Sequence, residues 1–194
     1  MSYARRVARP SLPHELRSTR LRLRRWTDDD LVPFAAMNAD ARVMEHFPKV
    51  LTREESDAVG ARIRAHFDAN GYGLWAVDVL GGAPFAGFVG LHDPGAELLG
   101  VPCVEVGWRL AHACWGKGYA TEAAREALRF GFDALGLDEI VSMTVPANVR
   151  SRRVMETIGM IRDEAGDFDH PRIPEGHPLR RHVLYRMTRP ETAA

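Results

Sequence analysis

The segment GWRLAHACWGKGYATEAAREAL, residues 107–128, indicates the fold more clearly than any other part of the chain. Its first residues complete an apolar strand, a loop with two glycines follows, and the Ala- and Glu-rich remainder is typical of a helix. Such a junction directs free backbone N–H groups and the positive end of the helix dipole toward one place. Gly116 and Gly118 let the backbone approach a ligand closely. The segment therefore predicts a phosphate site, although it contains neither of the two common nucleotide-binding glycine patterns.

The patterns on both sides of this segment predict a mixed sheet covered by helices. Strands are expected over residues 19–26, 73–80, 84–92, 103–110, 139–145 and 182–188. Helices are expected over residues 27–37, 52–70, 120–136 and 149–157, the first two opening with capping boxes. Gly81-Gly82 has the composition of a tight hairpin between the second and third strands. This order places the fold in the α/β or α+β class, with a β-loop-α-β unit after the hairpin.

Length and composition favour a single domain over residues 19–189. Residues 1–18 are predicted to form a basic, flexible N-terminal arm, and residues 190–194 a C-terminal tail. A contact with RNA or the ribosome is the alternative interpretation of the arm. Lys plus Arg and Asp plus Glu are equal at 26 each, however, and no aromatic RNA-binding motif is present. Both facts argue against nucleic acid as a partner.

The cysteines and the apolar runs indicate the compartment. Cys103 and Cys114 are the only cysteines, and their spacing fits neither a zinc site nor a disulfide framework. The N-terminus lacks the apolar core of a secretory signal, and no apolar run approaches the roughly 20 residues that span a bilayer. We therefore expect a cytoplasmic protein with no membrane partner and no metal.

Residues 115–120, WGKGYA, resemble the pyrophosphate loop R/Q-x-x-G-x-G/A of the GNAT N-acetyltransferases. Trp115 departs from the Arg or Gln of that motif, and WGKGYATEA is similar to the branch that includes the ribosomal-protein N-terminal acetyltransferases. Residues 146–160, PANVRSRRVMETIGM, resemble the N-x-x-S and Gly-Met segment of the same branch. With the first strand and the hairpin, the resemblance covers residues 18–188. It implies a mostly antiparallel mixed sheet in which two splayed strands open an acyl-CoA cleft.

The resemblance also implies that acetyl-CoA is the acyl donor and that an amine attacks its thioester directly. Strand backbone groups would hold the pantetheine arm, the glycine loop would hold the pyrophosphate, and Asn148 would hydrogen-bond to the arm. Lys117, Arg152 or Arg153 would meet a phosphate of the nucleotide, unless these cations are only solvated. The implied donor-binding residues are Trp108, Arg109, Leu110, Trp115, Gly116, Lys117, Gly118, Tyr119, Ala120, Thr121, Asn148 and Arg153.

Transfer to an amine needs a base, because an ammonium group has no free lone pair. Glu105 is the candidate, on the strand where GNAT enzymes often place a glutamate; the alternatives are an exposed carboxylate or a salt bridge to Arg109. Ser151 is the candidate donor to the departing sulfur, and an ordinary first-turn helix serine is its alternative. Tyr119 and Tyr185 are weaker candidates for that role, and Tyr119 is expected to pack behind the glycine loop.

Residues 167–186 contain three histidines among prolines and acids, but their spacing follows no zinc pattern. A rigid loop lining the acceptor site is expected instead, with His170, Asp169 and Glu175 near the acceptor amine. Three aromatic residues are expected in the core rather than in a pocket wall: Trp26, Phe47 and Trp75.

The favoured function is acetyl-CoA-dependent transfer of an acetyl group to a primary amine, either a protein N-terminus or a small molecule. The alternative from another class is a catalytically degenerate acyl-CoA-binding regulatory module, against which Glu105 and the intact glycine loop both argue. A homodimer is compatible with the edge strands of such a sheet.

Overall fold

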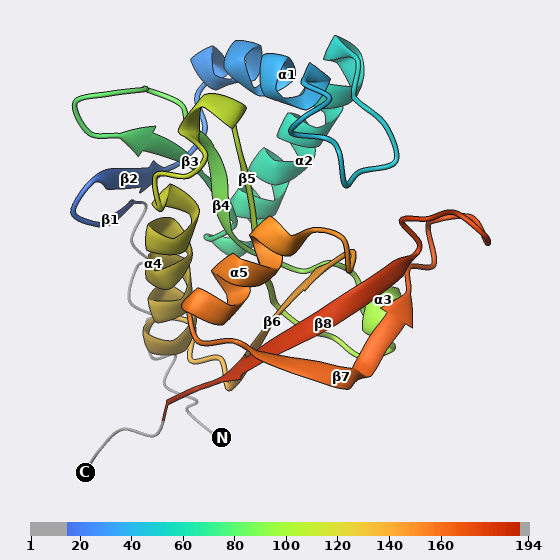
Figure 1. The fold of residues 1–194 in the computed structure, drawn as a ribbon. Helices are drawn as coiled ribbons and strands as arrows, with labels where there is room; N and C mark the ends of the chain where they lie inside the picture. Colours follow the sequence, from blue (N-terminus) through green and yellow to red (C-terminus); the bar gives the residue numbers. More distant parts are fainter. Residues whose placement is uncertain (1–14, 191–194) are drawn as a thin grey trace, which may run out of the picture.

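The computed structural model describes residues 15–190, which form one eight-stranded sheet with helices on both faces (Figure 1). The strands are β1 (Leu16–Arg17), β2 (Leu21–Arg24), β3 (Leu74–Val79), β4 (Gly87–His92), β5 (Glu105–Leu110), β6 (Glu139–Thr144), β7 (Ile161–Asp169) and β8 (Arg181–Thr188). The sheet order is β1-β2-β3-β4-β5-β6-β8-β7, and every neighbouring pair is antiparallel except β5 and β6. The predicted mixed, mostly antiparallel sheet is confirmed.

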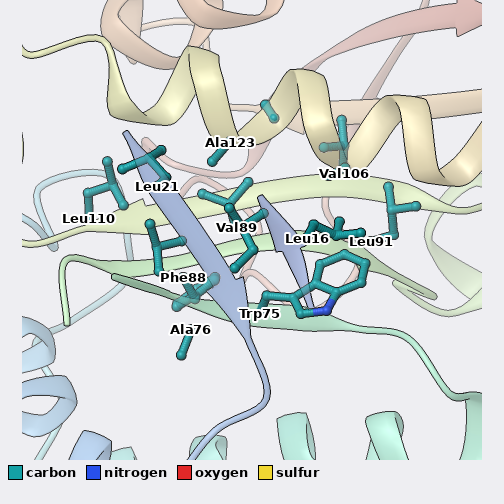
Figure 2. Packing of buried hydrophobic residues seen from close by; sticks show 14 of the residues in the cluster. Leu16, Leu21, Trp75, Ala76, Phe88, Val89, Leu91, Val106, Leu110 and Ala123 are labelled. Atoms are coloured by element: carbon teal, nitrogen blue, oxygen red, sulfur yellow. The ribbon is translucent and has the colours of Figure 1, made fainter. Parts of the chain in front are cut away.

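Helices cover both faces of the sheet, with α4 and α5 on one side and α1 and α2 on the other (Figures 1 and 2). The helices are α1 (Leu31–Ala39), α2 (Arg53–Asn70), α3 (Ala96–Leu99), α4 (Tyr119–Asp133) and α5 (Val149–Thr157), with 3-10 turns η1 (Asp28–Asp30) and η2 (His112–Cys114). Fully buried alanines, among them Ala123 and Ala127, let α4 pack closely on β4 and β5. Trp75 lies in the core between Phe67 of α2 and Phe130 of α4, with ring centroids 5.5 and 5.2 Å away.

The helix ends follow the sequence signals. In α2, the Glu55 N–H donates to the Thr52 hydroxyl at 3.2 Å, and the Thr52 N–H donates to the Glu55 carboxylate at 2.9 Å. Gly71 then ends the helix in the left-handed region, at φ 76°. The predicted capping box is therefore confirmed. Among residues 15–190, no helix is both long and apolar enough to cross a membrane.

Two strands were not predicted. β1 lies inside the segment assigned to the flexible arm, where Leu16 pairs with Leu23 of β2; residues 1–14 and 191–194 lie outside the described residues. β7 forms the opposite edge of the sheet, although most of it was not assigned and its end was expected to be loop. Its polar sequence lacks the alternation of apolar and polar residues that indicates a strand. Asp163, for example, pairs with Arg186 of β8 at 2.7 Å instead of burying an apolar side chain.

The arginines at the start of the described chain have carboxylate partners. Arg20 pairs with Glu122 and Arg22 with Asp78, both through short contacts, while Arg24 lies between Asp30 at 2.7 Å and Asp78 at 2.8 Å. The remaining pairs are Arg17 with Glu15 and Arg25 with Asp68. These arginines therefore tie strands and helices together, which fits a structural role better than an RNA contact.

Candidate active site

The sheet divides between β5 and β6. These two strands are paired only at Glu105 and Val141, where the Ser142 hydroxyl also donates to the Val106 carbonyl at 2.9 Å. Beyond this point β5 stays paired with β4 and β6 stays paired with β8, so the two strands separate. A cavity of ≈1080 Å³ is lined by both of them, and we call it the β5–β6 cleft.

The β5–β6 cleft brings together almost all of the residues singled out from the sequence. Those that line it are Glu105, Trp108, Arg109, Leu110, Trp115, Gly116, Gly118, Tyr119, Ala120, Thr121, Asn148, Ser151 and Arg153. Lys117 is exposed and is not among the lining residues, and neither is Arg152. Arg152 instead donates to the Tyr185 hydroxyl at 3.2 Å and to the Pro146 carbonyl. The side chains of Lys117 and Arg152 are therefore not among those that line the cleft, and their contact with a nucleotide phosphate stays a prediction.

The glycine loop presents backbone N–H groups to the cleft. Gly118 is the N-cap of α4 at φ 78° and offers no side-chain cap, so the N–H groups of the first helical turn lack an acceptor within the helix. Gly116, at φ 71°, has a second left-handed conformation that favours glycine. Trp115 anchors the loop, because its Nε1 donates to the Leu110 carbonyl at 2.8 Å.

The ion pair between Arg20, just before β2, and Glu122 of α4 supports the glycine loop. Arg20 Nη1 donates to the Lys117 carbonyl at 3.0 Å, and its guanidinium lies 5.0 Å from the centroid of the Tyr119 ring. The Glu122 carboxylate holds the same segment, accepting from the Arg20 N–H at 2.8 Å and the Ser18 hydroxyl at 2.6 Å. Burial would raise the pKa of Glu122, but these hydrogen bonds and the charge of Arg20 lower it below its usual value. Sequence reasoning missed this support because its parts lie about 100 residues apart.

The N-terminus of α5 carries Asn148 and Ser151. Asn148 caps the helix, since its Oδ1 accepts from the Ser151 N–H at 3.2 Å while its Nδ2 donates to the Thr144 hydroxyl at 2.9 Å. The second N–H of the Asn148 amide stays available to a ligand. The Ser151 hydroxyl belongs to a half-buried residue that lines the cleft, and its position in the first helical turn is compatible with both interpretations given above.

Glu105 faces His92 across the β4–β5 ladder. The two residues are register partners, and His92 Nε2 lies 3.2 Å from a Glu105 carboxylate oxygen. Burial would lower the pKa of His92, but the hydrogen bond to Glu105 and its negative charge raise that pKa above its usual value. The alternative of a salt bridge between Glu105 and Arg109 is wrong. Sequence reasoning missed His92, which only the strand register brings to the carboxylate.

Further histidines surround this pair. His170 at the end of β7 and His182 of β8 both line the cleft, with ring centroids 5.0 Å apart. Burial lowers the pKa of each, so both rings favour the neutral form. Asp169 and Glu175, which were expected near the acceptor together with His170, are not among the residues that line the cleft, and Asp169 lies 3.5 Å from Arg181. Within residues 15–190, no three His, Cys, Asp or Glu side chains are grouped to hold a metal ion.

The three aromatic residues expected in the core divide between core and cleft. Trp26 and Trp75 are buried, and Trp26 packs edge-on against Phe34 at 4.9 Å between ring centroids. Phe47 is half-buried in the α1–α2 connection and lines the cleft, where the Arg109 guanidinium lies 4.0 Å from its ring centroid. The prediction of a core position for Phe47 is therefore wrong, since its ring covers an arginine.

Comparisons with known proteins agree with this geometry. Residues 20–161 match the family model described as an acetyltransferase (GNAT) domain. FsC-acetyl coenzyme A-N(2)-transacetylase of Aspergillus fumigatus is 40% identical over 91 residues, which are 45% of this chain and 37% of that protein. The match therefore spans little more than a third of the fungal relative. The uncharacterized N-acetyltransferase YnaD of Bacillus subtilis is 29% identical over 162 residues, covering 81% of this chain and 87% of YnaD.

Solved structures show the same fold. A GNAT-family acetyltransferase from Bacillus anthracis superimposes with a TM-score of 0.75 at 27% identity, covering 90% of this chain and 98% of the other. The ribosomal-protein-S5-alanine acetyltransferase of Vibrio fischeri superimposes with a TM-score of 0.71 at 17% identity, covering 91% of this chain and 97% of the other. The second likeness is evidence of fold alone.

Proposed function

This chain belongs to the acetyltransferase (GNAT) family, and from that membership we propose that it transfers an acetyl group from acetyl-CoA to the nitrogen of a primary amine. The observation that carries the proposal is the separation of β5 and β6, which opens a cleft lined both by the α4 N-terminus and by the Glu105–His92 pair. The name of the fungal relative specifies acetyl coenzyme A and an N(2) position, which supports nitrogen as the acceptor atom. The acceptor is a protein N-terminus or a small-molecule amine.

The residues around the cleft suit acetyl-CoA. Uncapped N–H groups at the start of α4 and the bare backbone of Gly116 and Gly118 suit a pyrophosphate, because no side chain separates it from the donors. Arg153 is exposed at the rim, where it would meet a further phosphate. We assign the pantetheine arm to backbone groups of residues 108–110 and to the free N–H of Asn148. The cleft volume of ≈1080 Å³ leaves room for an acceptor as well.

The acceptor must lose a proton before it reacts, since a primary amine is mostly protonated near neutral pH. When bound, acetyl-CoA supplies the thioester carbon: the neutral nitrogen bonds to it, the C–S bond breaks, and the second proton that the nitrogen then releases balances the one taken up by the sulfur as a thiol. We assign the proton from nitrogen to Glu105, acting with His92 at 3.2 Å, because the pair can pass it toward the partly exposed imidazole. The Ser151 hydroxyl is assigned as hydrogen-bond donor to the sulfur.

The proposal is tested with the purified protein in two steps. Calorimetric titration with acetyl-CoA comes first, and we expect a dissociation constant in the micromolar range. Release of free CoA thiol is then followed with peptides that carry free N-termini and with small amines. Binding followed by amine-dependent thiol release supports the proposal. Binding without release for any amine indicates a regulatory acyl-CoA-binding module, and a folded protein that does not bind acetyl-CoA overturns the donor assignment.

A further inference from the structure

Within the described part of the chain, the Arg109 guanidinium has no carboxylate partner. Arg109 lies on β5 two residues beyond Gly107, and its Nη1 donates to the Asn38 side-chain carbonyl at 2.7 Å. Its Nε is buried and has no hydrogen-bond partner, and no carboxylate within residues 15–190 lies within 4.0 Å of the guanidinium. Phe47 and Phe88 lie 4.0 and 5.5 Å from it, measured to their ring centroids. Two aromatic rings thus remove water from the charge, while the protein supplies only one neutral acceptor.

Holding the Arg109 charge in these surroundings costs folding free energy when no ligand pairs with it. Burial lowers the pKa of Arg109 to about 10, so the group is still charged at neutral pH. A half-buried charge without a counter-ion is costly, because no opposite charge compensates for its lost hydration. The side chain is also held in place: Asn38 is fully buried and donates to the buried Ser56 hydroxyl at 2.9 Å, which fixes the carbonyl that orients Arg109. An arginine fork held by packing and lining a cleft is suited to bidentate recognition of a carboxylate.

The position of Arg109 indicates which substrate it meets. Alternate residues of a strand face the same side, so Glu105, Gly107 and Arg109 share the face of β5 that carries α1 and α2. The glycine loop opens α4, which covers the opposite face (Figure 1). Gly107 leaves the floor between the two charged residues bare, since the nearest atom to a side chain there would be His92 Nε2 at 3.6 Å. Glu105 and Arg109 are about 13 Å apart at their Cα atoms, from the ~3.3 Å rise per residue.

We propose that Arg109 is a specificity-determining residue for the acceptor, and that the acceptor is an amine that also carries a carboxylate. The amine nitrogen lies toward Glu105 and His92, Gly107 leaves room for the connecting atoms, and the carboxylate binds the guanidinium between Phe47 and Phe88. This assignment rests on the proposed acetyl transfer and names the substrate class of the same site. Three other arginines that line the cleft have carboxylate partners: Arg42 with Asp40, Arg150 with Glu45 and Arg172 with Glu97. Arg62 and Arg153 also line it without a carboxylate partner within residues 15–190, but both are exposed to solvent.

The test compares acids with their amides. Acceptor pairs of increasing length are assayed for CoA thiol release: an α-amino acid, 6-aminohexanoate and trialanine, each against its carboxamide. For at least one length we expect the acid to exceed the amide about tenfold or more in kcat/KM, the effect of one lost charge-assisted hydrogen bond. In a second readout without turnover, the N-acetylated acid should bind more tightly than its amide by calorimetry. Equal values for every acid and amide would overturn the assignment.

Two variants and one control test whether Arg109 causes the preference for acids over amides. Arg109→Gln removes the charge, and Asn38→Asp keeps Arg109 but gives it an internal carboxylate of nearly the same shape. Both should abolish the preference for the acid. Asn38→Asp, which changes no residue assigned to the donor, should also leave acetyl-CoA affinity unchanged, and it remains informative if Arg109→Gln does not fold. Arg42→Gln, at an arginine of the same cleft that already pairs with Asp40, should keep the preference. A preference that survives in both test variants refutes the role of Arg109.

The result is distinguishable from failure of the proposed function. A folded wild-type protein that fails to bind acetyl-CoA, or binds it without transfer to any amine, contradicts acetyl transfer itself. Transfer that proceeds equally well with acids and amides contradicts only the anion subsite. Loss of acetyl-CoA affinity in Arg109→Gln, with the acid-to-amide ratio unchanged, would assign Arg109 to the donor and overturn the inference.

Discussion

Gly116→Ala tests whether the loop backbone meets the acyl donor, and Gly81→Ala is its matched control. The two glycines have nearly the same backbone, at φ 71° and 70°, and an added Cβ would find no atom within 4 Å at either position. A non-glycine residue in this region costs about 1–2 kcal/mol, so both variants should lose the same unfolding free energy. Of these two glycines, only Gly116 lines the β5–β6 cleft. A methyl group there keeps phosphate oxygens from the N–H groups beside it.

The expected loss of affinity follows from those hydrogen bonds. A hydrogen bond to a charged group contributes about 1.5–3 kcal/mol, so losing one of them weakens acetyl-CoA binding roughly 10- to 100-fold. Calorimetric titration gives the affinity, and urea denaturation gives the unfolding free energy of each variant. If Gly116→Ala binds acetyl-CoA as tightly as Gly81→Ala does, the loop backbone does not approach the donor. If both variants lose affinity equally, general strain and not the site explains the result.

Two further predictions concern carboxylates. Glu105→Gln should lower kcat/KM by about 10²-fold or more, the usual contribution of a general base. Because Glu105 raises the pKa of His92, its removal lowers that pKa and should move the acidic limb of the pH–rate profile to lower pH. An unchanged acidic limb would exclude His92 from the proton path. Glu122→Gln should lower the unfolding free energy at pH 7 by about 1–3 kcal/mol. The pKa of Glu122 is depressed in the folded protein, so its contribution to the unfolding free energy is complete above pH ~4.5 and is lost as the pH falls through the folded pKa. The unfolding free energies of wild type and variant, plotted against pH, should therefore converge in acid. Parallel plots would show that the carboxylate charge contributes nothing.

The glycine-loop part of the cleft could be predicted because its residues are contiguous. One loop and one helix start supply the glycines, the uncapped N–H groups and the anchoring indole of Trp115. The class of fold followed from the same local signals, since capping boxes and alternating strands need no knowledge of distant partners. What could not be predicted within this half was its support by Arg20 and Glu122, which lie 102 residues apart in the chain.

The part of the cleft around Glu105 and His92 depends on strand register and on edge strands, which the sequence does not display. His92 reaches Glu105 only because β4 and β5 pair in one particular register, and a shift by one residue would turn it to the other face. His170 and His182 come together through the β7–β8 pairing, in which β7 has a charged sequence that resembles loop. Phe47 was expected in the core because aromatic residues usually are buried there, and its partner Arg109 is too far along the chain to correct that expectation.

The divided sheet itself explains why a ligand with peptide-like groups suits this cleft. β5 pairs with β4 over the whole of residues 105–110, and β6 pairs with β8 over the whole of residues 139–144, so each strand has one satisfied edge. The facing edges are joined only at Glu105 and Val141, which leaves backbone N–H and C=O groups of β5 directed at the cavity. Buried backbone groups need hydrogen-bond partners, and an amide-bearing arm laid along β5 supplies them as an added strand would. The same separation leaves Gly107 in the cavity lining, so the divergence of β5 and β6 creates both the proposed donor side and the proposed acceptor side.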